Sequence, residues 1–293
     1  MTSAGVDFDS YWRRVEQEAA LLSGGPVQVE EITIRSNEVS IAYGLRFNGV
    51  GGHPLFAYFC VPKGEGPFVP LFQAPGYGSV VHVPAFERRE RYAVMALCHR
   101  GQRLSNSIYK AAYPGLLTDG LPGMGSYIWR KIVADCLVAV DVLRRRPEVD
   151  SGRLAVSGND LAALVAGLRP VSTLLLDGAL LFRDGARHAA RTEAYPLQEF
   201  NDFRRAHPDQ WPEAEQTLSL YDPIWVAPRI KADTLISCPA ADEPVCTELA
   251  SAIGGNAEVR INTGYSYLDH KANEDWLAQS TGVPVSAGPF LPR

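Results

Sequence analysis

A short segment near the middle of the chain places one carboxylate where a strand turns sharply into a helix. Residues 153–157 have the apolar pattern of a buried strand, and a helix is predicted from Leu161 onward. A strand-to-helix turn that presents a single reactive side chain is a nucleophile elbow, and its tight backbone needs small residues two positions before and after the nucleophile. Counted from Asp160, these residues are Gly158 and Ala162. We therefore expect Asp160 to stand at the nucleophile position of an enzyme.

An acid and a histidine follow Asp160 in the order that enzymes with this elbow use, which is nucleophile, acid, histidine. Asp242 and His270 each follow a predicted strand, and open α/β sheets form their sites at the carboxyl ends of strands. We expect Asp242 to orient the His270 ring and to stabilise its charged form. Asp177 also ends a predicted strand and is the backup for this acid, although its place before Gly178 favours a plain turn.

Two backbone N–H groups are candidates for an oxyanion hole. One belongs to Leu161, directly after the elbow residue, and the other to Tyr77, in the loop that follows a short predicted strand. Gly76 and Gly78 make that loop pliable. We therefore expect the oxyanion of a substrate to lie between these two amides.

A carboxylate at the elbow limits the chemistry that is open to the enzyme. If Asp160 attacked an ordinary ester, it would form an anhydride and expel an alkoxide, whose conjugate acid has a pKa about 12 units above that of a carboxylic acid. Full dependence on leaving-group pKa would cost on the order of 16 kcal/mol. Displacement at saturated carbon avoids this cost, because the resulting alkyl ester can be hydrolysed by water that His270 activates. Alternatively, Asp160 or His270 acts as a general base without a covalent intermediate.

The predicted elements alternate in a way that positions these residues on one sheet. Residues 27–61 have antiparallel character, and the chain then alternates short buried strands with amphipathic helices. This alternation predicts an α/β-hydrolase fold, with a mostly parallel twisted sheet, helices on both faces and antiparallel leading strands. We expect a single domain over residues 1–293, with a helical insertion over 183–220.

The composition of the chain argues against several kinds of partner. The chain has 293 residues and a net charge of −5, which argues against a nucleic-acid partner. It contains no run of about 18 or more apolar residues, so no membrane partner is expected, and no signal peptide is visible at its start. The five cysteines are scattered, which indicates buried thiols in a reducing cytoplasm. The six histidines are also dispersed, so no metal site is expected.

Several segments together resemble the acetyl xylan esterase/cephalosporin C deacetylase family of α/β-hydrolases. They occur in the family's order and cover nearly the whole chain. They are residues 8–12 (Phe-Asp-Ser-Tyr-Trp), 75–77 (Pro-Gly-Tyr), 100–102 (Arg-Gly-Gln), 127–135, 144–153, 203–209, 218–222, 227–231 and 267–270 (Tyr-Leu-Asp-His). The elbow departs from the family's pattern, because the chain has Asn-Asp-Leu-Ala-Ala at residues 159–163 where the family has glycine-serine-glutamine-glycine-glycine.

The resemblance implies supporting roles for Arg100 and Gln102 beside the site, and a homo-oligomer, since family members often form rings. Together with the elbow it leads us to expect a cytoplasmic hydrolase that acts on a small molecule without metal or organic cofactor. Asp160 would be its nucleophile or general base, with His270 and Asp242. Two alternatives stay open: a carbohydrate or small-ester deacetylase in which His270 activates water, and a catalytically inactive homologue that binds a small molecule or a protein.

Overall fold

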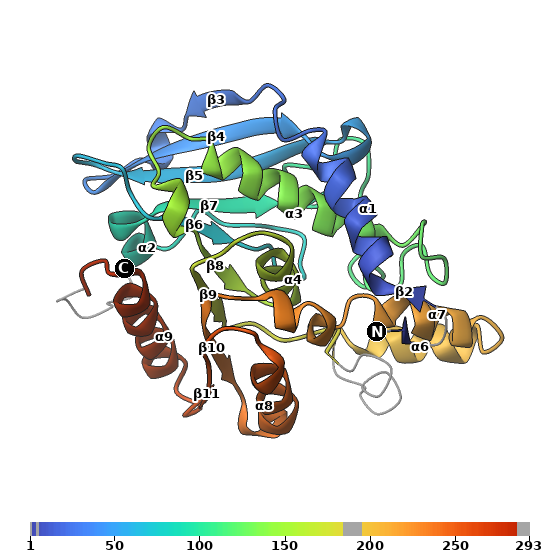
Figure 1. The fold of residues 1–293 in the computed structure, drawn as a ribbon. Coiled ribbons are helices and arrows are strands. Elements are labelled where there is room, and N and C mark those ends of the chain that lie inside the picture. Colours follow the sequence, from blue (N-terminus) through green and yellow to red (C-terminus); the bar gives the residue numbers. More distant parts are fainter. Residues whose placement is uncertain (1, 4–5, 184–194, 286–293) are drawn as a thin grey trace.

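A computed structural model describes residues 2–3, 6–183 and 195–285 of the chain. Its centre is a nine-stranded sheet in the order β11-β10-β9-β8-β6-β7-β5-β4-β3 (Figure 1). The strands are β3 (Gln28–Glu31), β4 (Ser40–Asn48), β5 (Pro54–Pro62), β6 (Pro70–Gln73), β7 (Ala93–Cys98), β8 (Ala155–Gly158), β9 (Thr173–Leu176), β10 (Asp233–Cys238) and β11 (Ala257–Ile261). A separate short ribbon pairs β1 (Thr2–Ser3) with β2 (Val6–Asp7).

The direction of the strands changes along the sheet. Strands β3, β4 and β5 are antiparallel to their neighbours, and β5 also pairs antiparallel with β7. The six remaining strands, from β7 through β6, β8, β9 and β10 to β11, are parallel. Every residue of β7 is buried, whereas every residue of the edge strand β3 is exposed. A strand that is buried throughout is typical of a parallel sheet that is covered on both faces.

Helices cover both faces of this sheet (Figure 1) and form two separate apolar cores. The larger core joins one face to α1 (Phe8–Ala20), α3 (Ile128–Arg144), α4 (Asp160–Leu168) and α8 (Glu243–Ala252). On the other face lie α2 (Phe86–Arg91), which contacts β5 and β7, and α9 (Ser266–Thr281), whose Leu277 belongs to the smaller core. The predicted α/β-hydrolase fold is confirmed.

Within the predicted insertion, residues 184–194 lie outside the part that the structure describes. The rest of it contains α6 (Gln198–Ala206) and α7 (Trp211–Ser219). Phe200 and Leu218 of these helices belong to the larger core, and the Trp12 indole of α1 donates to the Leu220 carbonyl over 2.9 Å. The segment 195–220 is therefore packed onto the same core as the sheet.

Short 3-10 helices occur in the connections, namely η1 (Thr33–Arg35), η2 (Val50–Gly52), η3 (Ser151–Arg153), η4 (Pro223–Trp225), η5 (Ala227–Arg229) and η6 (Ala240–Asp242). None of the helices in the described ranges is long and apolar enough to cross a membrane.

Candidate active site

A pocket of about 450 Å³ opens at the carboxyl ends of β6 and β9, beside α2 and the start of α9. Gln73, Arg88, Asp177 and His270 are among the polar side chains that line it, and valines 80, 81 and 83 form an apolar wall. The sequence predicts the site at this edge of the sheet, because ligands of open parallel sheets bind at the carboxyl ends of the strands.

The elbow turn forms as predicted in its backbone. Gly158 has φ of +140°, a conformation that side chains strongly disfavour, and a Cβ at this position would lie 3.1 Å from the Cβ of Ala74. Asn159 caps the following helix, because its side-chain oxygen accepts from the Leu161 N–H over 3.1 Å. The Leu161 amide, which the sequence predicts as an oxyanion donor, therefore already has a partner within its own turn.

The Asp160 carboxylate faces the chain that follows β9. It is 1% exposed, and it accepts from the Leu181 N–H over 2.5 Å and from the Phe182 N–H over 3.1 Å. Burial raises the pKa of Asp160 to about 7, although the two backbone hydrogen bonds act in the opposite direction. Asp160 is not among the residues that line the pocket. In this arrangement its carboxylate holds the segment after β9 against the start of α4.

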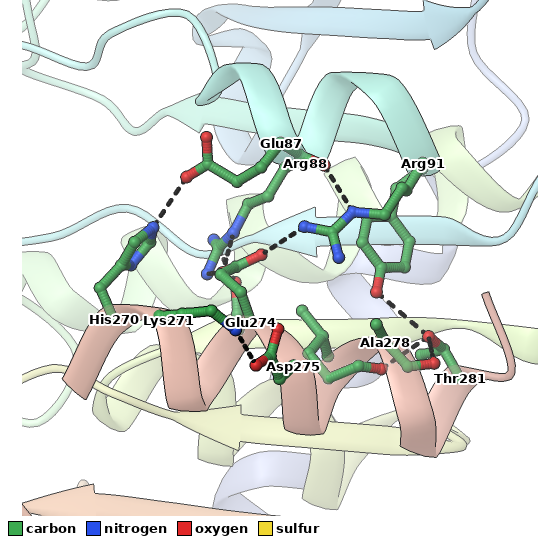
Figure 2. A network of polar contacts seen from close by, with 12 residues as sticks. Glu87, Arg88, Arg91, His270, Lys271, Glu274, Asp275, Ala278 and Thr281 are labelled. Carbon is green, nitrogen blue, oxygen red and sulfur yellow. Dashed lines mark hydrogen bonds and ion pairs between the residues drawn. The ribbon is translucent and has the colours of Figure 1, made fainter. Parts of the chain in front are cut away.

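The carboxylate that is hydrogen-bonded to His270 is Glu87 of α2, whereas the sequence predicts Asp242. The His270 Nε2 lies 2.7 Å from Oε1 of Glu87, which extends from α2 toward α9 (Figure 2). This hydrogen bond is the largest cause of a raised pKa for His270, and the same bond lowers the pKa of Glu87. Asp242 ends η6 and is not among the residues that line the pocket. The sequence predicts that Asp160, His270 and Asp242 act together. The observed hydrogen bonds instead join His270 to Glu87 and Asp160 to the backbone after β9.

Glu87 is not among the residues that the sequence predicts for the site, because those residues lie in loops or turns after strands. It lies in a helix, in the run Phe-Glu-Arg-Arg-Glu-Arg over residues 86–91, where a charged residue predicts nothing more than a solvated face. No local signal separates Glu87 from Glu90, so only the packing of α2 against α9 identifies it.

Arg88, which lines the pocket, is also the centre of a buried polar network between α2 and α9 (Figure 2). Its Nε donates to Glu274 over 2.8 Å, and its Nη1 donates to the Ser157 hydroxyl over 3.0 Å and to Gln73 over 3.3 Å. Arg91 approaches the second oxygen of Glu274 at 3.6 Å. Glu274 is completely buried, so these guanidinium groups supply the positive charge that its carboxylate needs.

Asp177 joins this network from the sheet. It directly follows β9, and its own N–H donates to the carbonyl of Gly158 over 3.0 Å, so it lies next to the elbow. Its carboxylate lies 3.4 Å from Nη2 of Arg88. Burial raises the pKa of Asp177, and Arg88 only partly offsets this effect. Asp177, which the sequence offers only as a backup for the acid, thus lines the pocket.

The predicted oxyanion loop lies beside the pocket, and Gly76 is part of the lining. Gln102 holds this loop, because its amide nitrogen donates to the carbonyls of Gly76 over 3.2 Å and of Gly78 over 2.8 Å. The Tyr77 hydroxyl donates to Glu199, which extends from α6. Gln102 therefore helps to hold the loop in place, and the Tyr77 side chain is directed to α6.

Arg100 forms an ion pair away from the pocket. Its guanidinium donates twice to Asp135 of α3, at 2.7 Å each, and once to the carbonyl of Val50 over 2.8 Å. A paired, bidentate guanidinium of this kind joins elements rigidly. Arg100 thus connects the end of β7 to α3. No group of three or more metal-ligating side chains is found in the described ranges.

Comparison with known proteins gives a consistent assignment. The sequence profile of the family described as acetyl xylan esterase (AXE1) matches residues 2–259. The chain is 24% identical over 294 residues to acetyl esterase Axe7A of Xylanibacter ruminicola, covering 94% of this chain but only 64% of that protein. Acetyl xylan esterase from Paenibacillus sp. R4 has a similar structure, with 25% identity, a TM-score of 0.78 and 90% coverage of both chains.

A second solved structure extends the likeness of the fold. Acetyl xylan esterase 1 from Thermoanaerobacterium sp. JW/SL YS485 is 22% identical, with a TM-score of 0.74, and the match covers 91% of this chain and 92% of that one.

Proposed function

Because the chain belongs to the acetyl xylan esterase (AXE1) family, we propose that it hydrolyses acetyl or similarly small esters in the pocket beside α2 and α9. The carbohydrate and acetyl specificities named for its relatives make acetylated sugars and small acetyl esters the first compounds to test. One observation carries the proposal: the same pocket is lined by His270, which is hydrogen-bonded to a carboxylate, and by Gly76 of the predicted oxyanion loop.

In this proposal His270 exchanges protons during the reaction. Glu87 orients the ring and stabilises its charged form, as the acid of a catalytic triad does for its histidine. The backbone N–H groups of the loop around Gly76 stabilise the oxyanion that develops when water attacks the ester carbonyl. Asp160 has a structural role, because its carboxylate is buried against two backbone amides. Direct attack by water also avoids the anhydride that an attacking carboxylate would form.

The test is a comparison of the wild-type protein with His270→Ala on p-nitrophenyl acetate and on acetylated xylose. Loss of a general acid–base group should lower kcat by about 100-fold or more, with little change in KM. His207→Ala is the matched control, since His207 is an exposed histidine at the end of α6, and it should keep the wild-type rate. A His270→Ala variant with the wild-type rate contradicts the proposal.

A second candidate is a protein that binds a small molecule without converting it. The observation in its favour is that Asp160, at the position where the family has its serine, is hydrogen-bonded to the Leu181 and Phe182 amides and is not among the residues that line the pocket. This candidate predicts no turnover of any acetyl ester, together with a saturable rise in melting temperature when an acetylated sugar is added. Turnover that depends on His270 rejects it.

A further inference from the structure

Of the three aspartates that the sequence offers for the site, only Asp177 lines the pocket. Asp160 is hydrogen-bonded to the chain after β9, and Asp242 lies at the end of η6 outside the lining residues. Asp177 is at the carboxyl end of β9, and its backbone is bonded to Gly158 of the elbow. It therefore occupies the place beside the elbow from which a carboxylate can meet a ligand.

The ion pair with Arg88 uses only one oxygen of the Asp177 carboxylate. Glu274 is the closer partner of Arg88, at 2.7 Å and with a side chain that is 0% exposed, and its second oxygen faces Arg91 at 3.6 Å. Asp177 lies farther away, at 3.4 Å, and 25% of its side chain is exposed. One side-chain contact at 3.4 Å and a partly exposed carboxylate leave Asp177 with hydrogen-bonding capacity for a ligand in the pocket.

We infer that Asp177 is the base that takes the proton from the attacking water, while His270 gives a proton to the departing alcohol. The inference rests on the proposed ester hydrolysis and deepens it by dividing the acid and base roles between two residues of one pocket. Asp177 extends from the sheet and His270 from α9, so an ester bound in the pocket has a carboxylate and an imidazole available from different elements.

Each proton and electron pair has a defined destination in this reaction. A proton moves from water to the Asp177 carboxylate as the water oxygen forms its bond to the carbonyl carbon, and the carbonyl oxygen becomes an oxyanion. Collapse of this intermediate re-forms the C=O bond and breaks the C–O bond to the alcohol. The departing oxygen takes the proton from the His270 imidazolium. The products are a carboxylic acid and an alcohol, and exchange of protons with solvent restores both side chains.

The surroundings of the two groups suit these roles. Asp177 faces Arg88 of α2, Glu274 and His270 of α9, and the backbone of β8; burial and Glu274 raise its pKa, which makes it a stronger base than an exposed aspartate. His270 faces Glu87 and Arg88 of α2 and Glu274 of its own helix, and the net effect is a raised pKa. A protonated imidazole beside an ionised carboxylate is the required starting state.

The experiment measures kcat against pH on p-nitrophenyl acetate for wild type and Asp177→Asn. We expect a bell-shaped wild-type profile, with Asp177 on the acidic limb and His270 on the alkaline limb. Asp177→Asn should lower kcat about 100-fold or more and remove the acidic limb, with KM nearly unchanged. Asp233→Asn is the matched control, because Asp233 is an exposed carboxylate at the other end of the same sheet.

The possible outcomes distinguish a failure of the base role of Asp177 from a failure of the proposed ester hydrolysis. If Asp177→Asn keeps kcat within threefold and retains the acidic limb, Asp177 is only an ion-pair partner and the inference fails, while wild-type turnover still supports ester hydrolysis. If the wild-type protein hydrolyses no ester, both fail. If Asp177→Asn does not fold, Asp177→Glu replaces it. That variant moves the carboxylate by one methylene and should lower kcat at least tenfold while the acidic limb persists; an unchanged kcat rejects the inference.

Discussion

Replacement of Asp160 by asparagine tests whether this carboxylate is a structural group. Asp160 has a pKa of about 7 in the folded protein against an ordinary value of 3.8. Since the folded-state pKa is raised, the protonated carboxyl stabilises the fold. This stabilisation is complete below the unfolded pKa and is lost as the pH rises through the folded one. With each pKa unit equal to about 1.4 kcal/mol, about 3 kcal/mol of stability should be lost between pH 5 and pH 8.

Asp160→Asn keeps the shape of the side chain but cannot ionise. Its amide oxygen can accept from Leu181 or Phe182, and loss of the other bond should cost about 1–3 kcal/mol. Because other groups titrate equally in both proteins, the informative quantity is the difference in unfolding free energy between wild type and variant. We expect this difference to be about 3 kcal/mol larger at pH 5 than at pH 8.

The assay is urea unfolding followed by circular dichroism at pH 5, 6, 7 and 8, together with acetyl-ester turnover. A difference that stays constant to within about 0.5 kcal/mol across this range refutes the assignment of a buried titrating carboxyl to Asp160. Turnover provides an independent test of the same assignment. A structural Asp160 predicts that the folded variant keeps most of its kcat, whereas loss of activity in a folded variant restores Asp160 as the reacting group.

Three further predictions concern the network and the elbow. Glu87→Gln keeps an acceptor oxygen but removes the negative charge that strengthens the hydrogen bond to His270 and favours its protonated ring, so the ring should titrate at lower pH by NMR and kcat should fall at alkaline pH; an unchanged titration curve contradicts the pairing. Arg88→Met leaves the buried Glu274 carboxylate without its closest partner and should cost about 3–5 kcal/mol in urea unfolding, part of which should return in Arg88→Met/Glu274→Gln. If the double variant is no more stable than the single one, the stranded charge is not the cause. Gly158→Ala places a side chain at φ of +140° and should destabilise the protein by about 1–3 kcal/mol by thermal and urea unfolding, whereas full stability argues against this turn.

The fold could be predicted because its signals are local and repeated. Apolar runs such as β7 predict buried parallel strands, and the spacing of apolar residues along α3 predicts a helix that packs on them. The elbow was also accessible to prediction, since its turn requires a glycine at residue 158 whatever the rest of the chain does. These features depend on backbone conformation and on burial, which neighbouring residues largely determine.

The direction of the side chains could not be predicted in the same way. The sequence predicts that Asp160 faces a substrate, but its hydrogen bonds go to Leu181 and Phe182, about twenty residues further along the chain. The predicted donor Leu161 is bonded to its neighbour Asn159. Sequence position places a residue at the end of a strand, but the rotamer depends on which donors the fold brings near.

Order along the chain was therefore enough to predict the sheet, its helical layers and the edge at which a site forms, because periodic burial and tight turns are encoded residue by residue. It was also enough to propose His270 as a functional residue. The carboxylate beside His270 was decided only in three dimensions, where α2 and α9 bring Glu87 within 2.7 Å of a ring that lies 183 residues away in sequence. The approach of Asp177 to Arg88 has the same origin. Such pairs depend on how whole elements pack, and no local pattern specifies that packing.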